Sequence, residues 1–185
     1  DSVPSVSGKA AILSGSCSAA TLGQVARFAQ DHPTFRVDPA ALADGKPVVA
    51  DAIAWAGERL DEGPALIYAS APPEEVKAAQ DRLGRAKAGD LIEEAMAEIA
   101  KALVETGVRR LVVAGGETSG AVVQALDVDG IRIGPQIDPG VPWTTTMGTT
   151  TMGSTTMGGT ELALALKSGN FGVEDFFLKA LDCAP

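Results

Sequence analysis

The clearest structural signal in the chain is the stretch RLVVAGGETSG, residues 110–120. Its first half is a short run of mostly branched apolar residues, typical of a buried strand, and the glycines that follow indicate a tight turn. The next residues, Ala121 to Leu126, have helix-forming composition. The stretch therefore predicts a strand, a glycine-rich turn and a helix in succession, which is the repeating unit of a parallel sheet.

The same succession occurs twice more. The apolar run at 10–13 is followed by SGSCS and a predicted helix over 19–30, and the run at 162–166 by KSGNFG and a predicted helix over about 173–181. Further strands are predicted at 35–38, 65–70 and 131–133, and further helices over 48–60, from 74–75 onward and over 91–106. The alternation predicts an α/β fold, a three-layer αβα domain with a mostly parallel sheet and glycine-rich loops at the carboxyl ends of its strands.

Composition limits the classes of partner. The 185 residues are 45% hydrophobic, which suits one domain over 1–185, and the 24 acidic and 15 basic residues give a net charge of -9. We expect neither nucleic acid nor an anionic membrane as partner, because no broad positive field would attract them. No apolar run reaches the roughly 18 residues of a membrane span. The two cysteines and single histidine have no metal-site spacing, so we expect a cytoplasmic protein with no protein-held metal site.

One segment departs from the alternating pattern. Residues 144–157 read TTTMG, TTTMG and STTM, a five-residue repeat that we interpret as a surface insertion at about 144–159, either hairpin-like or mobile. The alternative is a β-ribbon edge that pairs with a partner chain in a homo-oligomer. Just before it, the segment DPGVPW at 138–143 predicts a rigid turn, in which Asp138 either starts the turn or binds a metal.

The three glycine-containing loops predict a shared anion site. Loops at the carboxyl ends of parallel strands lie on one edge of the sheet, where glycines and helix N-termini offer backbone N–H groups to a phosphate. Lys167 is a candidate for direct contact with the anion. Glu117 either orients its loop or holds magnesium through water. None of the loops has the phosphate-loop or dinucleotide-binding consensus.

At these loops the sequence also resembles a known family. The segments LSGSCS, AGGETSG, DPGVPW and ALKSGNFG, which begin at residues 13, 114, 138 and 165, resemble the C-terminal nucleotide-binding domain of the four-carbon acid sugar kinases. That family includes 3-oxo-tetronate, D-erythronate and D-threonate kinases. The resemblance extends over nearly the whole chain and is interrupted at the threonine and methionine repeat.

The resemblance implies that this domain binds ATP, or its product ADP, with Mg2+, and that a separate N-terminal domain, absent from this chain, holds the acid sugar and supplies the catalytic base. On its own the chain is then expected to bind nucleotide without kinase activity. The nucleotide-binding residues that the resemblance and the loops together predict are Ser16, Ser18, Gly115, Gly116, Glu117, Thr118, Ser119, Gly120, Lys167, Ser168, Gly169 and Asn170.

Two other functions remain open from the sequence. The chain could be a non-catalytic binding or regulatory module that holds a phosphorylated metabolite in the same loops, or a structural module that assembles through its repeat. Among the aromatic residues, Phe171 is the candidate to stack on an adenine ring, whereas Trp55, Tyr68 and Trp143 are interpreted as packing residues.

Overall fold

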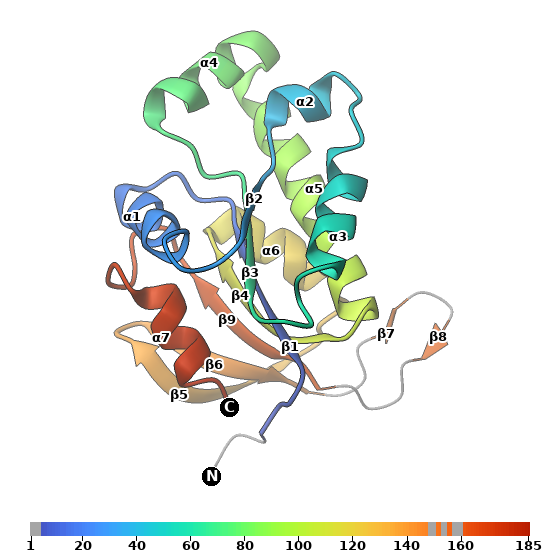
Figure 1. The fold of residues 1–185 in the computed structure, drawn as a ribbon, viewed down its shortest axis with the longest axis vertical. Helices are drawn as coiled ribbons and strands as arrows, with labels where there is room; N and C mark the ends of the chain where they lie inside the picture. The colour runs from blue at the N-terminus through green and yellow to red at the C-terminus, as the bar shows by residue number, and fades with distance from the viewer. Residues whose placement is uncertain (1–4, 148–150, 153–154, 157–160) are drawn as a thin grey trace.

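The computed structural model describes residues 5–147, 151–152, 155–156 and 161–185 (Figure 1). The elements, in chain order, are β1 (Lys9–Ser14), α1 (Ala19–Phe28), β2 (Thr34–Arg36), α2 (Pro39–Ala43), α3 (Val48–Gly57), β3 (Ala65–Tyr68), α4 (Pro73–Leu83), α5 (Arg85–Glu105), β4 (Val108–Ala114), α6 (Gly116–Ala125), β5 (Ile131–Asp138), β6 (Val141–Thr146), β7 (Thr151–Met152), β8 (Thr155–Thr156), β9 (Ala163–Lys167) and α7 (Phe176–Asp182).

The main sheet has seven strands in the order β2-β3-β1-β4-β9-β6-β5. The first five are mutually parallel, and β6 and β5 complete one end of the sheet in antiparallel pairing. The prediction of a mostly parallel sheet is confirmed. After β1 the chain builds the β3 side and then crosses to β4 on the other side, so the strand order reverses between β1 and β4. In open α/β sheets, ligands bind outside the carboxyl ends of the strands at such a reversal.

Helices cover both faces of the sheet, as the three-layer prediction required. In Figure 1, α1 and α7 lie over one face, and α3, α5 and α6 over the other. Alternate residues of one strand enter different cores, as in β1, where Leu13 packs with α3, α5 and α6 while Ile12 packs with α1 and α7. Because both faces are covered, the central strands are buried along nearly their whole length.

Two helices and the start of a third extend beyond the sheet. Figure 1 shows α2, α4 and the first turns of α5 above the carboxyl ends of the strands, on the side where the three glycine-containing loops emerge. The sequence predicted the start of α4 but not α2, and it placed the start of α5 at residue 91, six residues after its start at Arg85. No helix in the described part of the chain is both long and apolar enough to cross a bilayer.

The structure corrects three local predictions. The segment GGETSG is mostly helical, because α6 begins at Gly116, so the loop after β4 is much shorter than expected. The segment DPGVPW belongs to a β-hairpin, with a turn at residues 139–140 between β5 and β6.

The third correction concerns the repeat. Thr144, Thr145 and Thr146 are buried in β6 and pair with β9 and β5, so an insertion starting at 144 is wrong. Their branched side chains suit a strand, which outweighs the low-complexity pattern. Farther along, β7 and β8 form an antiparallel pair, in line with the hairpin-like interpretation. The remaining repeat positions, 148–150, 153–154 and 157, lie outside the described residues.

Candidate functional site

The loops that follow β1, β4 and β9 meet at one edge of the sheet. The N–H groups of Gly15 and Ser16 donate to the carbonyl oxygen of Ala114, at 2.9 and 3.3 Å, and the N–H of Gly115 donates to the carbonyl oxygen of Lys167 at 2.8 Å. These hydrogen bonds continue the pairing of the three parallel strands past their carboxyl ends. We call residues 15–18, 115–118 and 167–170 together the rim.

Two glycines allow the loops of the rim to touch. A Cβ atom at Gly169 would collide with Ser16 Oγ and lie 3.2 Å from Ser18 Oγ, while at Gly115, whose φ is +119°, it would lie 3.1 Å from the backbone nitrogen of Ser16. Gly115 needs the freedom of glycine for both the close approach and the positive φ, and Gly169 for the close approach alone. Segments about a hundred and fifty residues apart in sequence are therefore in direct contact, as their predicted positions at one edge required.

The rim presents unpaired backbone donors. The first hydrogen bond of helix α6 runs from the Ser119 N–H to the Gly115 carbonyl oxygen, and no side chain caps the helix. The N–H groups of Gly116, Glu117 and Thr118 therefore have no protein acceptor among the described residues. A Cβ atom at Gly116 would meet no heavy atom within 4 Å. An anion can therefore approach this helix end without displacing a side chain, and the helix dipole favours it.

The two predicted serines have different roles. Ser18 is the N-cap of α1, where its hydroxyl accepts from Thr21 N–H at 3.2 Å and bonds to the Gly169 carbonyl oxygen. Ser16 Oγ accepts from Ser18 N–H at 3.2 Å and keeps its own proton for another acceptor. Of the pair, Ser16 is the hydroxyl that can donate to a ligand, whereas Ser18 holds the loops together.

The remaining predicted residues are distributed around the same place. Glu117, Ser168 and Asn170 are exposed, Gly120 is exposed on α6, and Thr118 is buried against Gly15. Ser119 is half-buried, and its Oγ is buried without a hydrogen-bond partner. Lys167 is only 1% exposed, and its Nζ is hydrogen-bonded within the protein. The structure thus brings the three predicted loops together but turns Lys167, Thr118 and Ser18 inward.

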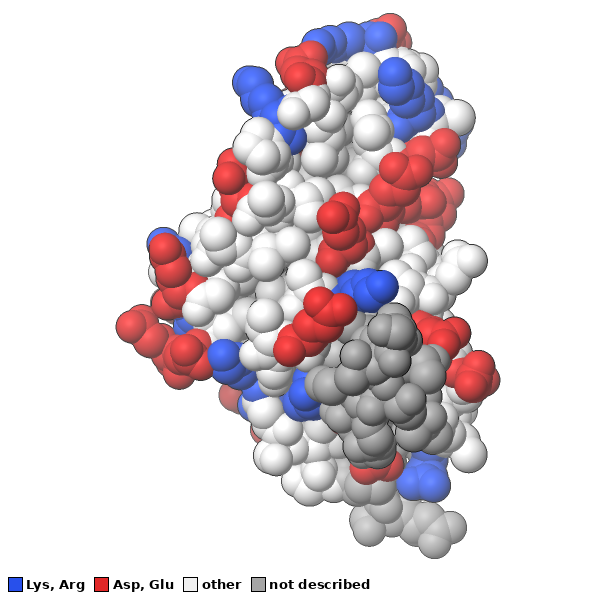
Figure 2. All heavy atoms as spheres, turned by 90° about the vertical axis from the view of Figure 1, so that its right-hand side faces the viewer, with Lys and Arg blue, Asp and Glu red and all other residues white. Residues whose placement is uncertain are grey.

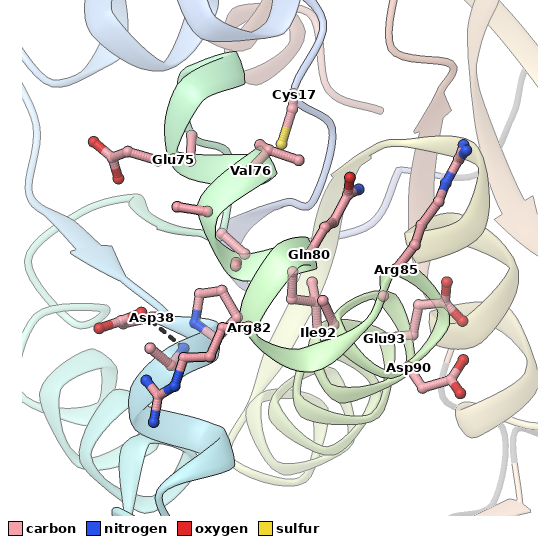
Figure 3. Close-up of a pocket in the computed structure, with 18 of the residues that line it drawn as sticks. Cys17, Asp38, Glu75, Val76, Gln80, Arg82, Arg85, Asp90, Ile92 and Glu93 are labelled. Carbon is pink, nitrogen blue, oxygen red and sulfur yellow. Dashed lines mark hydrogen bonds between the residues drawn. The ribbon is translucent and has the colours of Figure 1, made fainter.

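A groove of about 870 Å³ opens beside the rim. Its floor comes from residues after β1, β2, β3 and β4, and its walls from α4 and α5 (Figure 3). Alanines at positions 69, 71, 78, 79, 86 and 88 make much of the lining apolar, and Cys17 and Val76 also line it. A groove of this size with an apolar lining and a few polar groups is typical of a small-molecule site.

Both basic and acidic residues line the groove. Arg36 pairs with Glu75, and Arg82 pairs with Asp44. Arg85 has no ion pair or hydrogen bond within the described residues. Figure 2 shows basic side chains gathered at the end formed by α2, α4 and the start of α5, with acidic side chains across the middle of the same face. Five acidic residues and three arginines line the groove, so its lining is not positive overall. Arg85, the one arginine of the lining without an ion pair within the described residues, is the group that could meet an anion there.

Two glutamates lie where the groove meets the rim. Burial, together with the charge of Glu117 and a hydrogen bond to it, raises the pKa of Glu93. Two neighbouring carboxyls of this kind are a donor set that a divalent cation would neutralise. Within the described residues, no cluster of three or more aspartate, glutamate, histidine or cysteine side chains could hold a metal by itself.

The DPGVPW segment does not line the groove. Asp138 is 3% exposed and accepts from Val173 N–H at 3.0 Å and from Lys179 Nζ of α7. Burial pushes the pKa of Asp138 up, but the bonds from Lys179 and Val173 outweigh it and lower the pKa below its usual 3.8. Trp143 is fully buried and donates to the Ala180 carbonyl oxygen at 3.0 Å. Of the two predicted roles for Asp138, starting a turn or binding a metal, these contacts favour a role in the fold.

The Asp138 ion pair gives a pH-dependent prediction. Because the pKa of Asp138 is lower in the folded state than in the unfolded state, the ion pair stabilises the fold fully above pH 3.8. This stabilisation disappears as the pH falls through the folded-state pKa of Asp138. Asp138→Asn should lower the free energy of unfolding at pH 7 by about 1–3 kcal/mol, and the difference from wild type should shrink below pH 4. Urea unfolding at several pH values measures this. Asp182→Asn, at an exposed position of α7, is the control, and an equal loss at pH 7 and pH 3 would contradict the prediction.

Sequence reasoning missed the α4 side of the site. Arg82, Arg85 and Glu93 carry no local signal, because they lie on ordinary amphipathic helices whose position above the sheet is set by tertiary packing. Phe171, the candidate for adenine stacking, is 45% exposed but packs against Gly140 of the β5–β6 turn and does not line the groove. His32 stacks on Phe28 at the end of α1, a packing role.

Comparison with known proteins supplies a family context. A family model described as "Nucleotide-binding C-terminal domain" matches residues 11–177. The chain is 54% identical to the 3-oxo-tetronate kinase of Burkholderia multivorans over 180 residues, 97% of this chain and 40% of that one. It is also 54% identical to the enzyme of the same name from Pseudomonas fluorescens, over 97% of this chain and 39% of that one.

A solved structure is also similar to this chain. The crystal structure of a Haemophilus influenzae protein of the DUF1537 family matches with a TM-score of 0.88 and 37% identity, over 99% of this chain and 42% of that one. The chain therefore spans about 40% of the length of the relatives it matches.

Proposed function

The chain belongs to the family of nucleotide-binding C-terminal domains, and on this basis we propose that it is the ATP-binding part of a kinase that phosphorylates a four-carbon acid sugar of the 3-oxo-tetronate type. The relatives whose names indicate the reaction are 3-oxo-tetronate kinases, and the family model and the geometry of the rim both support a nucleotide. The acid sugar and the catalytic base would be held by another part of the kinase. Alone, the chain binds nucleotide without transferring phosphate.

One observation supports the nucleotide most strongly, the contact between the loops that carry Ser16, Gly116 and Gly169. These loops bring unpaired N–H groups and a free hydroxyl proton to one place at the reversal of strand order. Phosphoryl transfer needs the phosphate chain to be positioned and its charge neutralised more than it needs covalent chemistry. A rim of backbone donors meets that need without a net positive charge on the protein.

The groove suits the nucleoside. Its volume lies within the range of small-molecule sites, and Ala71, Val76 and Ile92 provide apolar surface for a base. Arg85, with no protein partner within the described residues, is available to an anionic group near the mouth. In this arrangement the base enters the groove and the phosphates extend toward the N-terminus of α6.

Glu93 and Glu117 would hold Mg2+ together with the phosphates. Magnesium in kinase sites is bound through one or two carboxylates and substrate oxygens and retains water, which suits a pair of glutamates at the junction of groove and rim. The ion would offset the phosphate charge during transfer. The two carboxyls would hold the ion, and the rim amides would bind the phosphate chain.

Isothermal calorimetry with MgADP and MgATP tests this function on the chain as it is. We expect saturable one-site binding, and Ser16→Ala should weaken it about tenfold by removing a donor to a charged acceptor. Ser7→Ala, at an exposed position remote from the rim, is the matched control. The absence of both heat and a thermal shift, in a chain shown by circular dichroism to be folded, would overturn the proposal.

A further inference from the structure

Lys167 is the last residue of β9, and its ammonium lies beneath the rim. Nζ donates to Thr21 Oγ1 at 3.0 Å, to the Ser168 carbonyl oxygen at 3.2 Å and to the Gly169 carbonyl oxygen at 3.1 Å. An ammonium has three protons, and these three acceptors use all of them. Within the described residues no carboxylate pairs with Lys167, so the charge is held by neutral oxygens alone.

The backbone of the loop is oriented by these bonds. A trans peptide group is planar, with its N–H opposite its C=O, and the described chain has no cis peptide. Because the Ser168 and Gly169 carbonyls face the ammonium, the N–H groups of Gly169 and Asn170 point away from it. Neither N–H has an acceptor among the described residues. The loop therefore presents two amide donors on the side opposite the lysine.

Side chains of helix α1 bind the carbonyl oxygens farther along the same loop. Gln24 is 1% exposed, and its Nε2 donates to the carbonyl oxygens of Phe171, Gly172 and Val173 at 3.0–3.1 Å. Ser18 and Thr21 hydroxyls also bond to the Gly169 oxygen. Side chains on the inner side thus bind the carbonyl oxygens of residues 168, 169 and 171–173. The N–H groups of the first two of these peptides then point outward.

We propose that Lys167 is a positioning residue for the nucleotide: its ammonium turns the Ser168 and Gly169 carbonyls inward, so that the Gly169 and Asn170 amides face a phosphate group. This rests on the proposed function and replaces the expectation that Lys167 touches the anion itself. The phosphate accepts hydrogen bonds from the two backbone amides. The lysine ammonium lies on the opposite side of the loop and affects binding only by holding these peptide groups in place.

Burial disfavours the charge of the Lys167 ammonium and lowers the pKa of Lys167 to about 8. Its neighbours are Thr21 of α1, the Phe176 ring of α7 at 5.9 Å and Ala114 on β4, none of which titrates in this range. An apolar side chain would fill the space without this cost, but it would remove the one donor that the Ser168 and Gly169 carbonyls share. The Ser168 oxygen would keep the Phe171 N–H, and the Gly169 oxygen would keep the Ser18 and Thr21 hydroxyls.

Lys167→Met tests the proposal, because methionine has a similar length and no charge. In the ligand-free chain, the amide resonances of Gly169 and Asn170 in a nitrogen–proton NMR spectrum should move and their hydrogen exchange should accelerate. Affinity for MgADP should fall about tenfold or more. In the wild type, the same two resonances should titrate near pH 8, and in Lys167→Met they should not. Lys101→Met, on the far part of α5, should change none of these.

Two results would overturn the proposal. If the ligand-free resonances stay in place while MgADP affinity falls, Lys167 contacts the phosphate directly. If affinity is unchanged although the resonances move, the loop does not bind the phosphate. Failure of the proposed function is recognised separately, because the wild-type chain would then bind no MgADP, whereas the ligand-free spectra still report whether Lys167 orients the loop.

Discussion

Gly116→Val should abolish detectable nucleotide binding while the chain stays folded. Gly116 is the first residue of α6, and a side chain there would project into open space that, in the proposed site, the phosphates occupy. Excluding the phosphate removes two or more hydrogen bonds to a charged group, each about 1.5–3 kcal/mol, which corresponds to a loss of about 100-fold or more. Calorimetry with MgADP measures the loss.

Gly57→Val is the matched control for that change. Gly57 ends α3, and a Cβ atom there would also meet nothing within 4 Å, but it lies away from the rim and the groove. Both variants should keep the wild-type circular dichroism spectrum, and only Gly116→Val should lose affinity. Wild-type affinity in Gly116→Val would mean that the N-terminus of α6 is not a phosphate site.

Leu164→Ala should give the largest loss of stability among the changes considered. Leu164 is fully buried in the middle of β9, between β4 and β6, in the core formed with α3, α5 and α6. Removing its branched end leaves a cavity in a region held by strands on both sides. We expect the free energy of unfolding to fall by about 2–5 kcal/mol in equilibrium urea denaturation.

The control for Leu164→Ala is Ile133→Ala, since Ile133 is 73% exposed on the edge strand β5. That change should alter the free energy of unfolding by about 0.5 kcal/mol or less. An equal loss at both positions would contradict the assignment of β9 to the centre of the core.

The rim was predictable because it follows from topology. Once three apolar runs are assigned to parallel strands, their carboxyl ends must share an edge, and the glycines and serines after Leu13, Ala114 and Leu166 come together there. The groove was not predictable, because α4 could pack anywhere along the sheet as far as its own residues indicate. Its place above the edge is set by contacts with α2 and α5.

Local errors have local physical causes. Glycine is typical of loops, so GGETSG was predicted as one, but the first turn of a helix needs no side chain and tolerates Gly116. Thr144 to Thr146 read as part of a repeat, yet their branched side chains and the pairing partner β9 make them a strand. For Lys167, the sequence located a charge at the end of a buried strand, but only the folded loop identifies its acceptors.

The most direct test is a crystal structure of the chain with Mg2+ and a non-hydrolysable ATP analogue. We expect phosphate oxygens within hydrogen-bond distance of the Gly116 and Gly169 amides and the Ser16 hydroxyl, with the base in the groove beside α4. An analogue bound elsewhere, or with its phosphates directed away from all three loops, would contradict the central claim that the rim binds the phosphate chain.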